Sequence, residues 1–241
     1  MLHKSNFAIV IPVYNHEQMI RDIVIKSLEL NLPIFVVDDG STDSSYQTIK
    51  DIPNITILRH STNKGKGAAL LTGFTEATKT ADWAVTIDAD GQHNPYDALK
   101  MIHAVSSKPA LIIGMRTGMS GTNIPWTSRF GRKFSNFWVW ASGGLWLNDT
   151  QTGFRIYPLP EVLNLNVKAR RFQFEVEVLA KAMWHKIPIT EIPVNVKYNP
   201  GTGRVSHFRP FIDFIRNSTT FTCLIFQRIF IPQSIRKKYR I

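Results

Sequence analysis

The chain of 241 residues contains one cysteine, Cys223. A single cysteine excludes an intramolecular disulfide framework and any metal site built from several cysteines, and it is typical of a reducing compartment. Every run of about 18 residues contains a charge, so the sequence predicts no transmembrane span. The N-terminus, MLHKSNFAIVIPVYN, lacks an apolar stretch followed by a small-residue cleavage site, and we therefore expect no signal peptide. Internal repeats and low-complexity linkers are also absent.

Acidic residues are scarce near the C-terminus. Residues 201–241 contain one acid, Asp213, and eight basic residues, so eight positive charges and one negative give +7 of the formal net charge of +11. Such a segment suits an anionic membrane surface or nucleic acid. Because no nucleic-acid recognition motif accompanies the charge, we expect the membrane surface and no nucleic-acid partner.

Apolar, β-branched segments alternate with segments of helical spacing, which predicts an open α/β sheet with mostly parallel strands. The predicted strands are 7–14, 33–41, 55–60, 83–88 and 110–115. Helices are predicted at 20–31, from Asp43, at 64–79 and at 95–107. Residues 114–136, rich in Gly, Ser and Arg, are interpreted as a flexible loop that leads into an aromatic helix.

Polar clusters follow nearly every predicted strand. They are Asn15–Glu17, Asp38–Asp43, Asn63–Gly67, Asp88–His93 and Arg116. Ligands of such sheets bind beyond the carboxyl ends of the strands, so we expect these five loops to converge on one edge.

The stretch DAD, residues 88–90, predicts a site for a hard divalent cation. Magnesium and manganese prefer carboxylate oxygens and keep open positions for phosphate oxygens. Alternate side chains on a strand share a face, so Asp88 and Asp90 can point together at a metal diphosphate, with Gln92 or His93 completing the site. The alternative for an isolated DAD is a turn with capping acids.

Three further clusters have a functional and a structural interpretation. In DDGSTD, Asp39 suits a base or ribose, whereas Ser41–Asp43 suit a helix cap. In NKGKGAA, Lys66 stands at a helix start that can bind an anion, or in a solvated turn. In NDTQTGFR, Asp149 is a candidate general base and Arg155 a candidate anion ligand, or the two form a structural pair.

Together these residues resemble the family-2 glycosyltransferases, and most closely the dolichyl- or polyprenyl-phosphate sugar synthases. The similarity runs in order through IPVYNHE, VVDDGSTD, NKGKGAA, DADGQH, IIGMR, DTQTGFRIY, FQFEVEVLAKA and ITEIPV, across roughly residues 7–195. It implies a GT-A fold, a nucleotide-diphosphate sugar donor, Mg²⁺ or Mn²⁺ as cofactor, and inverting transfer to a lipid acceptor. The chain departs from the family's YNE in one place, where His16 precedes Glu17.

The resemblance and the clusters described above together assign roles to individual residues, with Lys66, Asp149 and Arg155 proposed from the clusters. Those for the nucleotide sugar are Pro12, Tyr14, Glu17, Asp39, Lys66, Asp88 and Ala89. Those for the metal are Asp88, Asp90 and Gln92. Those for the acceptor are Arg116, Arg129, Arg132, Ser135 and Arg155. The catalytic set is Asp149, Arg116 and Asp90.

Two classes of acceptor, and a third hypothesis in which the domain is not catalytic, remain open at this point. A lipid phosphate is already anionic and needs no strong base, whereas a hydroxyl on a lipid or glycan needs one, for which Asp149 is the candidate. The third hypothesis is a catalytically silent domain that binds nucleotide or membrane.

The C-terminal segment has helical spacing of aromatic and aliphatic residues, with Pro210 at the predicted start and Pro232 after the end. We therefore expect a GT-A domain over 1–205 and a basic amphipathic tail over 206–241. A basic helix with an aromatic face suits an anionic membrane interface, and the alternative is that it packs on the core. The protein is accordingly expected in the cytoplasm, peripheral on the inner face of the cell membrane.

Overall fold

The computed structural model describes residues 7–117, 126–196 and 210–236, and the side chains of 7–117, 131–196 and 218–236. The strands are β1 Phe7–Val13, β2 Ile34–Asp38, β3 Thr56–Arg59, β4 Trp83–Thr86, β5 Leu111–Thr117, β6 Arg155–Pro158 and β7 Ile189–Asn195. The helices are α1 Ile20–Leu28, α2 Ser45–Ile49, α3 Lys66–Ala77, α4 Asp97–His103, α5 Trp126–Gly143, α6 Glu161–Asn164, α7 Phe174–Trp184, α8 Pro210–Phe230 and α9 Gln233–Arg236.

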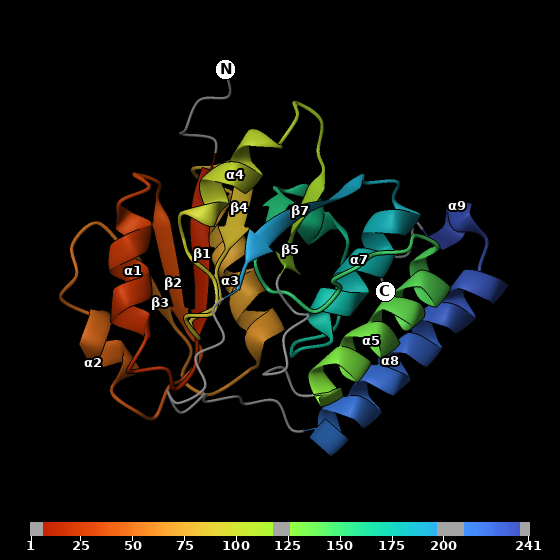
Figure 1. The fold of residues 1–241 in the computed structure, drawn as a ribbon, viewed down its shortest axis with the longest axis horizontal. Coiled ribbons are helices and arrows are strands. Elements are labelled where there is room, and N and C mark those ends of the chain that lie inside the picture. Colours follow the sequence, from red (N-terminus) through yellow and green to blue (C-terminus); the bar gives the residue numbers. More distant parts are fainter. Residues whose placement is uncertain (1–6, 118–125, 197–209, 237–241) are drawn as a thin grey trace.

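The strands form one sheet in the order β3-β2-β1-β4-β6-β5-β7 (Figure 1). All neighbouring pairs are parallel except those of β6, which runs antiparallel to β4 and β5. The predicted α/β class with a mostly parallel sheet flanked by helices is therefore confirmed. Each of the five predicted strands is present within a few residues of its expected bounds.

Alternation along β1 divides the core between the two faces of the sheet, because successive strand side chains point to opposite sides. Ala8 and Val10 lie in a hydrophobic cluster with residues of α3 and α7. Ile9 and Ile11 lie in a second cluster with residues of α1 and α4. Helices thus cover both faces and leave the strand ends to the loops.

Helices α5 and α8 lie side by side outside α7, at the end of the molecule away from α1 and α2 (Figure 1). As predicted, α8 begins at Pro210 and ends before Pro232. Phe221 and Leu224 of α8 are buried in the same cluster as residues of α7. One side of the predicted tail therefore packs on the core, while the boundary proposed at 205–206 lies outside the described residues.

The interpretation of 114–136 as a loop is wrong over much of its length. Residues up to Thr117 extend β5, and α5 begins at Trp126. Glycine and serine suggested a loop, but the helix that begins here continues to Gly143 and packs against α8, where the rings of Trp138 and Phe221 are 6.0 Å apart. These tertiary contacts outweigh the local preference.

Candidate active site at the carboxyl edge of the sheet

The polar loops meet at one edge of the sheet, as predicted from their position after parallel strands. Because β6 is antiparallel, the segment that precedes it, residues 148–154, arrives at the same edge as the ends of β1, β2 and β4. Thr86 at the end of β4 donates a hydrogen bond to the Gly153 carbonyl, at 2.6 Å. The reversed strand thus brings a sixth segment to the site.

The loop after β1 is fastened to the loop after β2. The backbone N–H of Asn15 donates to Ser41 Oγ (3.1 Å), and Asn15 Oδ1 accepts from the Thr42 N–H (2.8 Å). Glu17 Oε2 accepts from the Ser44 N–H at 2.8 Å. The inserted His16 therefore does not remove Glu17 from this edge, where the side chain caps the start of α2. Two further candidates for the nucleotide sugar come from the same segment: Pro12 is buried within β1, and Tyr14 is half-buried directly after it.

Asp38 and Asp39, which capping of α2 left unexplained, are both buried. Asp38 lies 2.9 Å from Arg59 Nε and accepts from the Ser41 N–H at 2.8 Å. Asp39 accepts from the N–H groups of Lys64 (2.9 Å) and Gly65 (2.7 Å), and its Oδ1 lies 2.6 Å from His60 Nδ1. The Asp39 carboxylate therefore fixes the start of the loop that leads into α3.

Lys66, at the start of α3, joins two carboxylates from distant parts of the chain. Its Nζ lies 2.6 Å from Asp88 Oδ1 and 2.6 Å from Glu175 Oε1. Burial acts against the charged form of each group, but the facing charges outweigh it: the pKa of Asp88 is lowered and that of Lys66 is raised. Lys66 and Asp88 are therefore ionised as a pair, and in this largely buried triad the positive charge between the two carboxylates comes from the protein itself.

Gly153 provides the space for this triad. A Cβ at this position would meet both carboxylate oxygens of Asp88 and the Nζ of Lys66. Any side chain larger than glycine would therefore displace the charged groups, which explains the glycine in DTQTGFR on steric grounds.

The alternation predicted for DAD is present, although β4 ends before it at Thr86. Ala89 is 3% exposed, whereas Asp88 and Asp90 on either side are partly exposed. Asp90 Oδ1 accepts from the Gln92 N–H at 3.1 Å, so it is the backbone of Gln92 that contacts this acid. Among the described residues, no three His, Cys, Asp or Glu side chains are grouped closely enough to hold a metal ion. Two carboxylates fit a magnesium or manganese ion that takes its other ligands from water and a diphosphate.

His93 lies beneath these loops and is neutral at physiological pH. It is 6% exposed, its ring centroid is 5.0 Å from that of Phe154, and its Nε2 lies 3.4 Å from Thr152 Oγ1. Burial disfavours the imidazolium and lowers the pKa of His93 to about 4. His93 thus fills the floor of the site as an uncharged group.

Arg116 and Asp149 form a bidentate pair. Arg116 Nε lies 2.7 Å from Asp149 Oδ2, and one terminal nitrogen donates to Oδ1 at 2.8 Å. The Asp149 carboxyl is fully buried; burial alone would raise its pKa, but the Arg116 guanidinium holds it below the usual range. Glu191 Oε1 in turn accepts from the Asp149 N–H at 2.8 Å. This arrangement fixes the direction of the arginine.

The remaining acceptor candidates differ in burial and in their hydrogen-bond partners. Arg155 is fully buried and donates to the carbonyls of Thr152, Thr150 and Glu175, so it pairs with backbone and not with Asp149. Ser135 is buried and accepts from Thr150 Oγ1 at 2.9 Å. These contacts favour structural roles for both residues. Arg132 is half-buried and its charge acts on Asp149. The side chain of Arg129 lies outside the described residues.

Sequence reasoning did not single out Glu175 and Glu191, which hold Lys66 and the loop that carries Asp149. A signal for Glu175 existed. Two acids, Glu175 and Glu177, stand in the mostly apolar helix FEVEVLAKAMW, and both are buried. Buried carboxylates require partners, so an acid among apolar helix residues indicates a hidden cation or N–H donor.

The strand ends thus bring together Lys66 between Asp88 and Glu175, the partly exposed Asp90, and Arg116 held by Asp149. The glycosyl transferase family 2 model matches residues 8–158, and the chain belongs to this family of sugar-transferring enzymes.

Individual relatives are lipid-phosphate glycosyltransferases. The UDP-N-acetylglucosamine–dolichyl-phosphate N-acetylglucosaminyltransferase of Methanococcus voltae is 32% identical over 213 residues, which cover 79% of this chain and 85% of that protein. The polyprenol monophosphomannose synthase of Mycolicibacterium smegmatis is 29% identical, over 77% of this chain and 75% of its own length.

The fold matches solved structures of low sequence identity. Glucosyl-3-phosphoglycerate synthase from Mycobacterium tuberculosis, in complex with Mn²⁺, uridine diphosphate and phosphoglyceric acid, superposes with a TM-score of 0.69 at 18% identity. The match covers 95% of this chain and 80% of that one. The predicted GT-A fold is therefore confirmed.

Proposed function

We propose that the protein transfers a sugar, with inversion, from a nucleotide-diphosphate sugar to a polyprenyl- or dolichyl-type lipid phosphate at the cytoplasmic face of the membrane. The proposal rests on the geometry around Arg116 and on relatives whose names include dolichyl phosphate and polyprenol as substrates.

The donor is assigned to Asp88 and Asp90, with magnesium or manganese. A divalent cation held by these carboxylates supplies positive charge that stabilises the leaving nucleoside diphosphate. Lys66 adds a second cation beside Asp88, at the N-terminus of α3, where backbone N–H groups also favour anions. In the reaction, the bond from the anomeric carbon to the donor phosphate oxygen breaks, and its electron pair leaves with the diphosphate. A phosphate oxygen of the acceptor forms the new bond from the opposite side.

The observation that carries the choice of acceptor is the Arg116–Asp149 pair. A general base needs a pKa near the working pH and a lone pair within reach of the proton that it removes. Asp149 has a lowered pKa, is fully buried, and both of its oxygens accept from Arg116. A lipid phosphate needs no such base, and a guanidinium held in one orientation suits an anionic acceptor.

The test measures transfer by the purified full chain with a panel of UDP and GDP sugars and manganese. Each donor is paired with a polyprenyl phosphate and with the matching polyprenol. We expect product only with the phosphate, and loss of transfer in Asp90→Ala. Transfer to the polyprenol at a comparable rate would support the hydroxyl alternative, and unchanged transfer in Asp90→Ala would contradict the metal role.

A further inference from the structure

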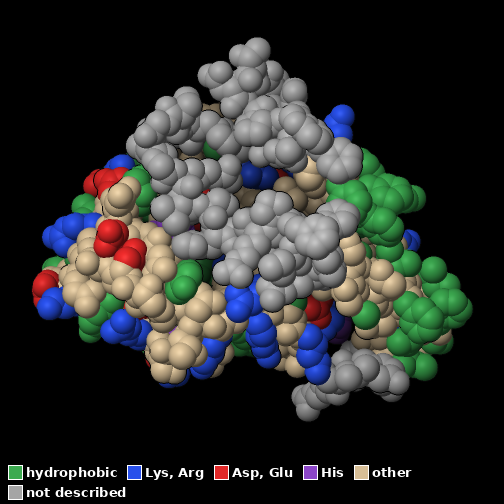
Figure 2. All heavy atoms as spheres, turned by 90° about the horizontal axis from the view of Figure 1, so that it is seen from below, with side chains coloured by type: hydrophobic (Ala, Val, Ile, Leu, Met, Phe, Trp, Pro, Cys, Tyr) green, Lys and Arg blue, Asp and Glu red, His purple; other side chains and the backbone are tan. Residues whose placement is uncertain are grey.

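Exposed apolar side chains are concentrated at one end of the molecule. Eleven large hydrophobic side chains are exposed among the described residues, and eight of them lie on α5, the turn after it, α8 and α9. Figure 2 shows hydrophobic side chains gathered at this end. Scattered single residues are common on soluble proteins, but a cluster of this kind marks an interaction surface.

Helix α5 and the following turn contribute four of these residues. They are Phe137, Trp140, Leu145 and Trp146. The rings of Phe137 and Trp140 are 5.7 Å apart, and Trp146 is 56% exposed. Tryptophan combines a large apolar ring with a polar N–H, which suits a boundary between water and an apolar phase.

The last turns of α8 and the short helix α9 contribute the other four. They are Phe226, Ile229, Phe230 and Ile235. Positions 226, 229 and 230 share one side of a helix, and Ile229 and Phe230 are 67% and 65% exposed. The two groups of four are called the α5–α8 face below.

Arg228 joins the two helices within this face. One of its terminal nitrogens donates to the carbonyls of Trp140 (2.9 Å) and Ala141 (2.6 Å), near the C-terminal end of α5. The Trp140 carbonyl also accepts from the Gly144 N–H at 2.8 Å, and a cation near a helix C-terminus interacts favourably with the carbonyls exposed there. The exposed residues therefore stand on a fixed scaffold.

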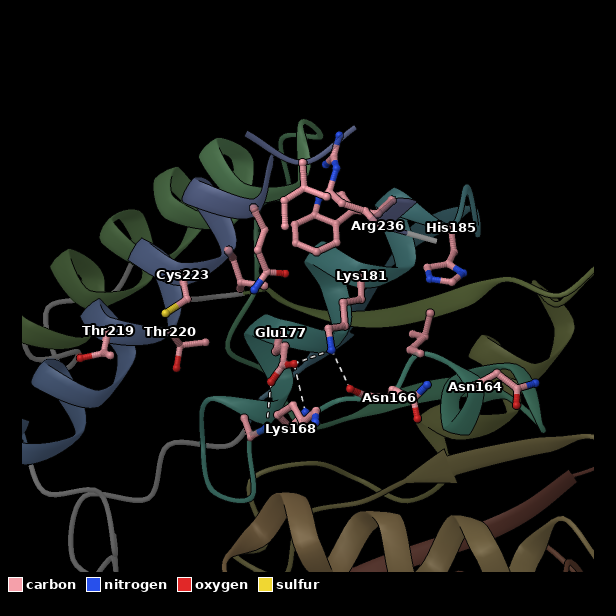
Figure 3. A pocket seen from close by; sticks show the side chains of 16 residues that line it. Asn164, Asn166, Lys168, Glu177, Lys181, His185, Thr219, Thr220, Cys223 and Arg236 are labelled. Carbon is pink, nitrogen blue, oxygen red and sulfur yellow. Dashed lines mark hydrogen bonds and ion pairs between the residues drawn. The ribbon is translucent and has the colours of Figure 1, made fainter. Parts of the chain in front are cut away.

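The other side of α8 lines a cavity of about 1090 Å³ between α7 and α8. Lys168, Lys181 and Arg236 line it (Figure 3). Glu177 is the one carboxylate among its described lining residues; it accepts from the N–H groups of Lys168 and Ala169 and pairs with Lys181 at 2.8 Å, which leaves Lys168 and Arg236 as the excess positive charge. The α5–α8 face is thus flanked by a groove with excess positive charge.

This charge distribution favours a lipid bilayer over a second copy of the chain. The described side chains of α8 and α9 include Arg228 and Arg236 and no acid. A symmetric contact between two copies would bring these cations together, whereas an anionic bilayer attracts them, by about 1 kcal/mol for each cation near the surface. None of the described helices is long and apolar enough to span a membrane, so the contact is with the surface layer.

We propose that the α5–α8 face is the surface on which the protein docks to an anionic lipid bilayer, with Trp140, Trp146 and Phe230 entering the interface. The proposal gives the proposed transfer to a lipid phosphate a defined orientation. The middle of α5 touches the active-site loop, since Asn136 Nδ2 donates to the Asn148 carbonyl at 2.8 Å. Arg132 stands about 12 Å from Trp140 along the helix axis. Helix α5 therefore connects the bilayer surface with the acceptor site.

The first test measures partitioning of the full chain onto vesicles that contain no sugar acceptor. One set is phosphatidylcholine alone, and the other contains about 30 mol% phosphatidylglycerol. We expect binding to the anionic vesicles that weakens at high salt, and at least about tenfold weaker binding for Trp146→Ser combined with Phe230→Ser. The matched control is Ile25→Ser, which removes an exposed side chain of α1 and leaves binding unchanged. Equal binding by wild type and the double variant would overturn the proposal.

A second test locates the tryptophans. Vesicles with brominated acyl chains quench tryptophan that enters the bilayer, and Trp146→Phe keeps the apolar character while it removes one reporter. We expect quenching in the wild type that decreases in this variant, and no quenching would overturn the proposal. A dimer that the double variant dissociates, with vesicle binding unchanged, would assign the face to a second copy.

These tests separate docking from catalysis. The double variant is expected to retain wild-type transfer to a detergent-solubilised lipid phosphate, because none of its changed residues contacts the site. Absence of transfer to any acceptor, with vesicle binding intact, would contradict the proposed function and leave the docking surface standing.

Discussion

Replacement of Lys66 by methionine tests the electrostatic arrangement of the site most directly. The change removes the cation between Asp88 and Glu175 and keeps a flexible apolar stem of similar length. Asp88 and Glu175 then lie close together without a cation between them, and two neighbouring carboxylates disfavour each other's ionisation. In the wild type the pKa of Lys66 is raised and that of Asp88 is lowered, so at neutral pH the full stabilisation from these groups is present.

The expected loss in the free energy of unfolding is about 3 kcal/mol, the lower part of the range for removing one partner from a buried ion pair. The lower part applies because the Lys66 and Asp88 side chains are 18% and 21% exposed. The matched control is Lys79→Met. Lys79 pairs with Glu76 on the same helix, but its side chain is 63% exposed, so its loss should cost less than about 1 kcal/mol.

The assay is urea unfolding at neutral pH, with EDTA or with Mn²⁺ and no nucleotide. Manganese should stabilise Lys66→Met more than the wild type, because the variant offers Asp88 without a competing ammonium group. Equal stabilisation of both proteins by manganese, or equal stability of the Lys66 and Lys79 variants in EDTA, would refute this account.

Three further predictions concern neighbouring residues. The pKa of His93 is about 4 in the folded chain, against 6.5 in the unfolded chain. The free energy of unfolding should therefore fall by up to about 3 kcal/mol as the pH drops from 6.5 to 4, because the unfolded chain binds the proton more readily. Urea unfolding in EDTA should show a shallower pH dependence in His93→Gln. Gly153→Ala should weaken donor binding by roughly tenfold or more in calorimetry, because the new Cβ meets the Lys66–Asp88 pair. Gly131→Ala should not weaken it, because a Cβ there would lie at an ordinary contact distance of 3.9 Å from Gln151 Nε2. Asp149→Asn should lower kcat with a lipid phosphate by about tenfold or more and leave donor affinity and the pH profile unchanged; loss of one limb of the pH profile would instead identify Asp149 as a base.

The sequence predicted the sheet and the edge at which the loops meet, because strand periodicity and the polar residues after each strand are local signals. The position of Asp88 and Asp90 at this edge could be predicted for the same reason, because they directly follow a predicted strand; their role as metal ligands stays a prediction. The pairing of Arg116 with Asp149 could not be predicted, because it joins positions 33 residues apart. The periodicity of the sequence does not show which of several arginines meets a given acid.

Predictions also failed where tertiary contacts outweigh composition. The segment 114–136 contains enough glycine and serine for a loop, yet residues 114–117 extend β5 and residues 126–136 belong to α5, whose later residue Trp138 packs against Phe221 of α8. Arg155 seemed a natural anion ligand, but its position on β6 puts it inside the core, and its donors satisfy backbone carbonyls. The direction of β6 decides this, and a four-residue strand carries no local mark of its direction.

The antiparallel strand β6 has a mechanical consequence as well. By pairing with both β4 and β5, it makes strands β1–β4 on one side and strands β5 and β7 on the other one continuous hydrogen-bonded sheet. A hinge between the two sides would have to break a ladder of backbone hydrogen bonds within the core. Any opening and closing around substrates therefore has to involve segments outside the sheet. The edge of the sheet that carries the candidate site stays rigid.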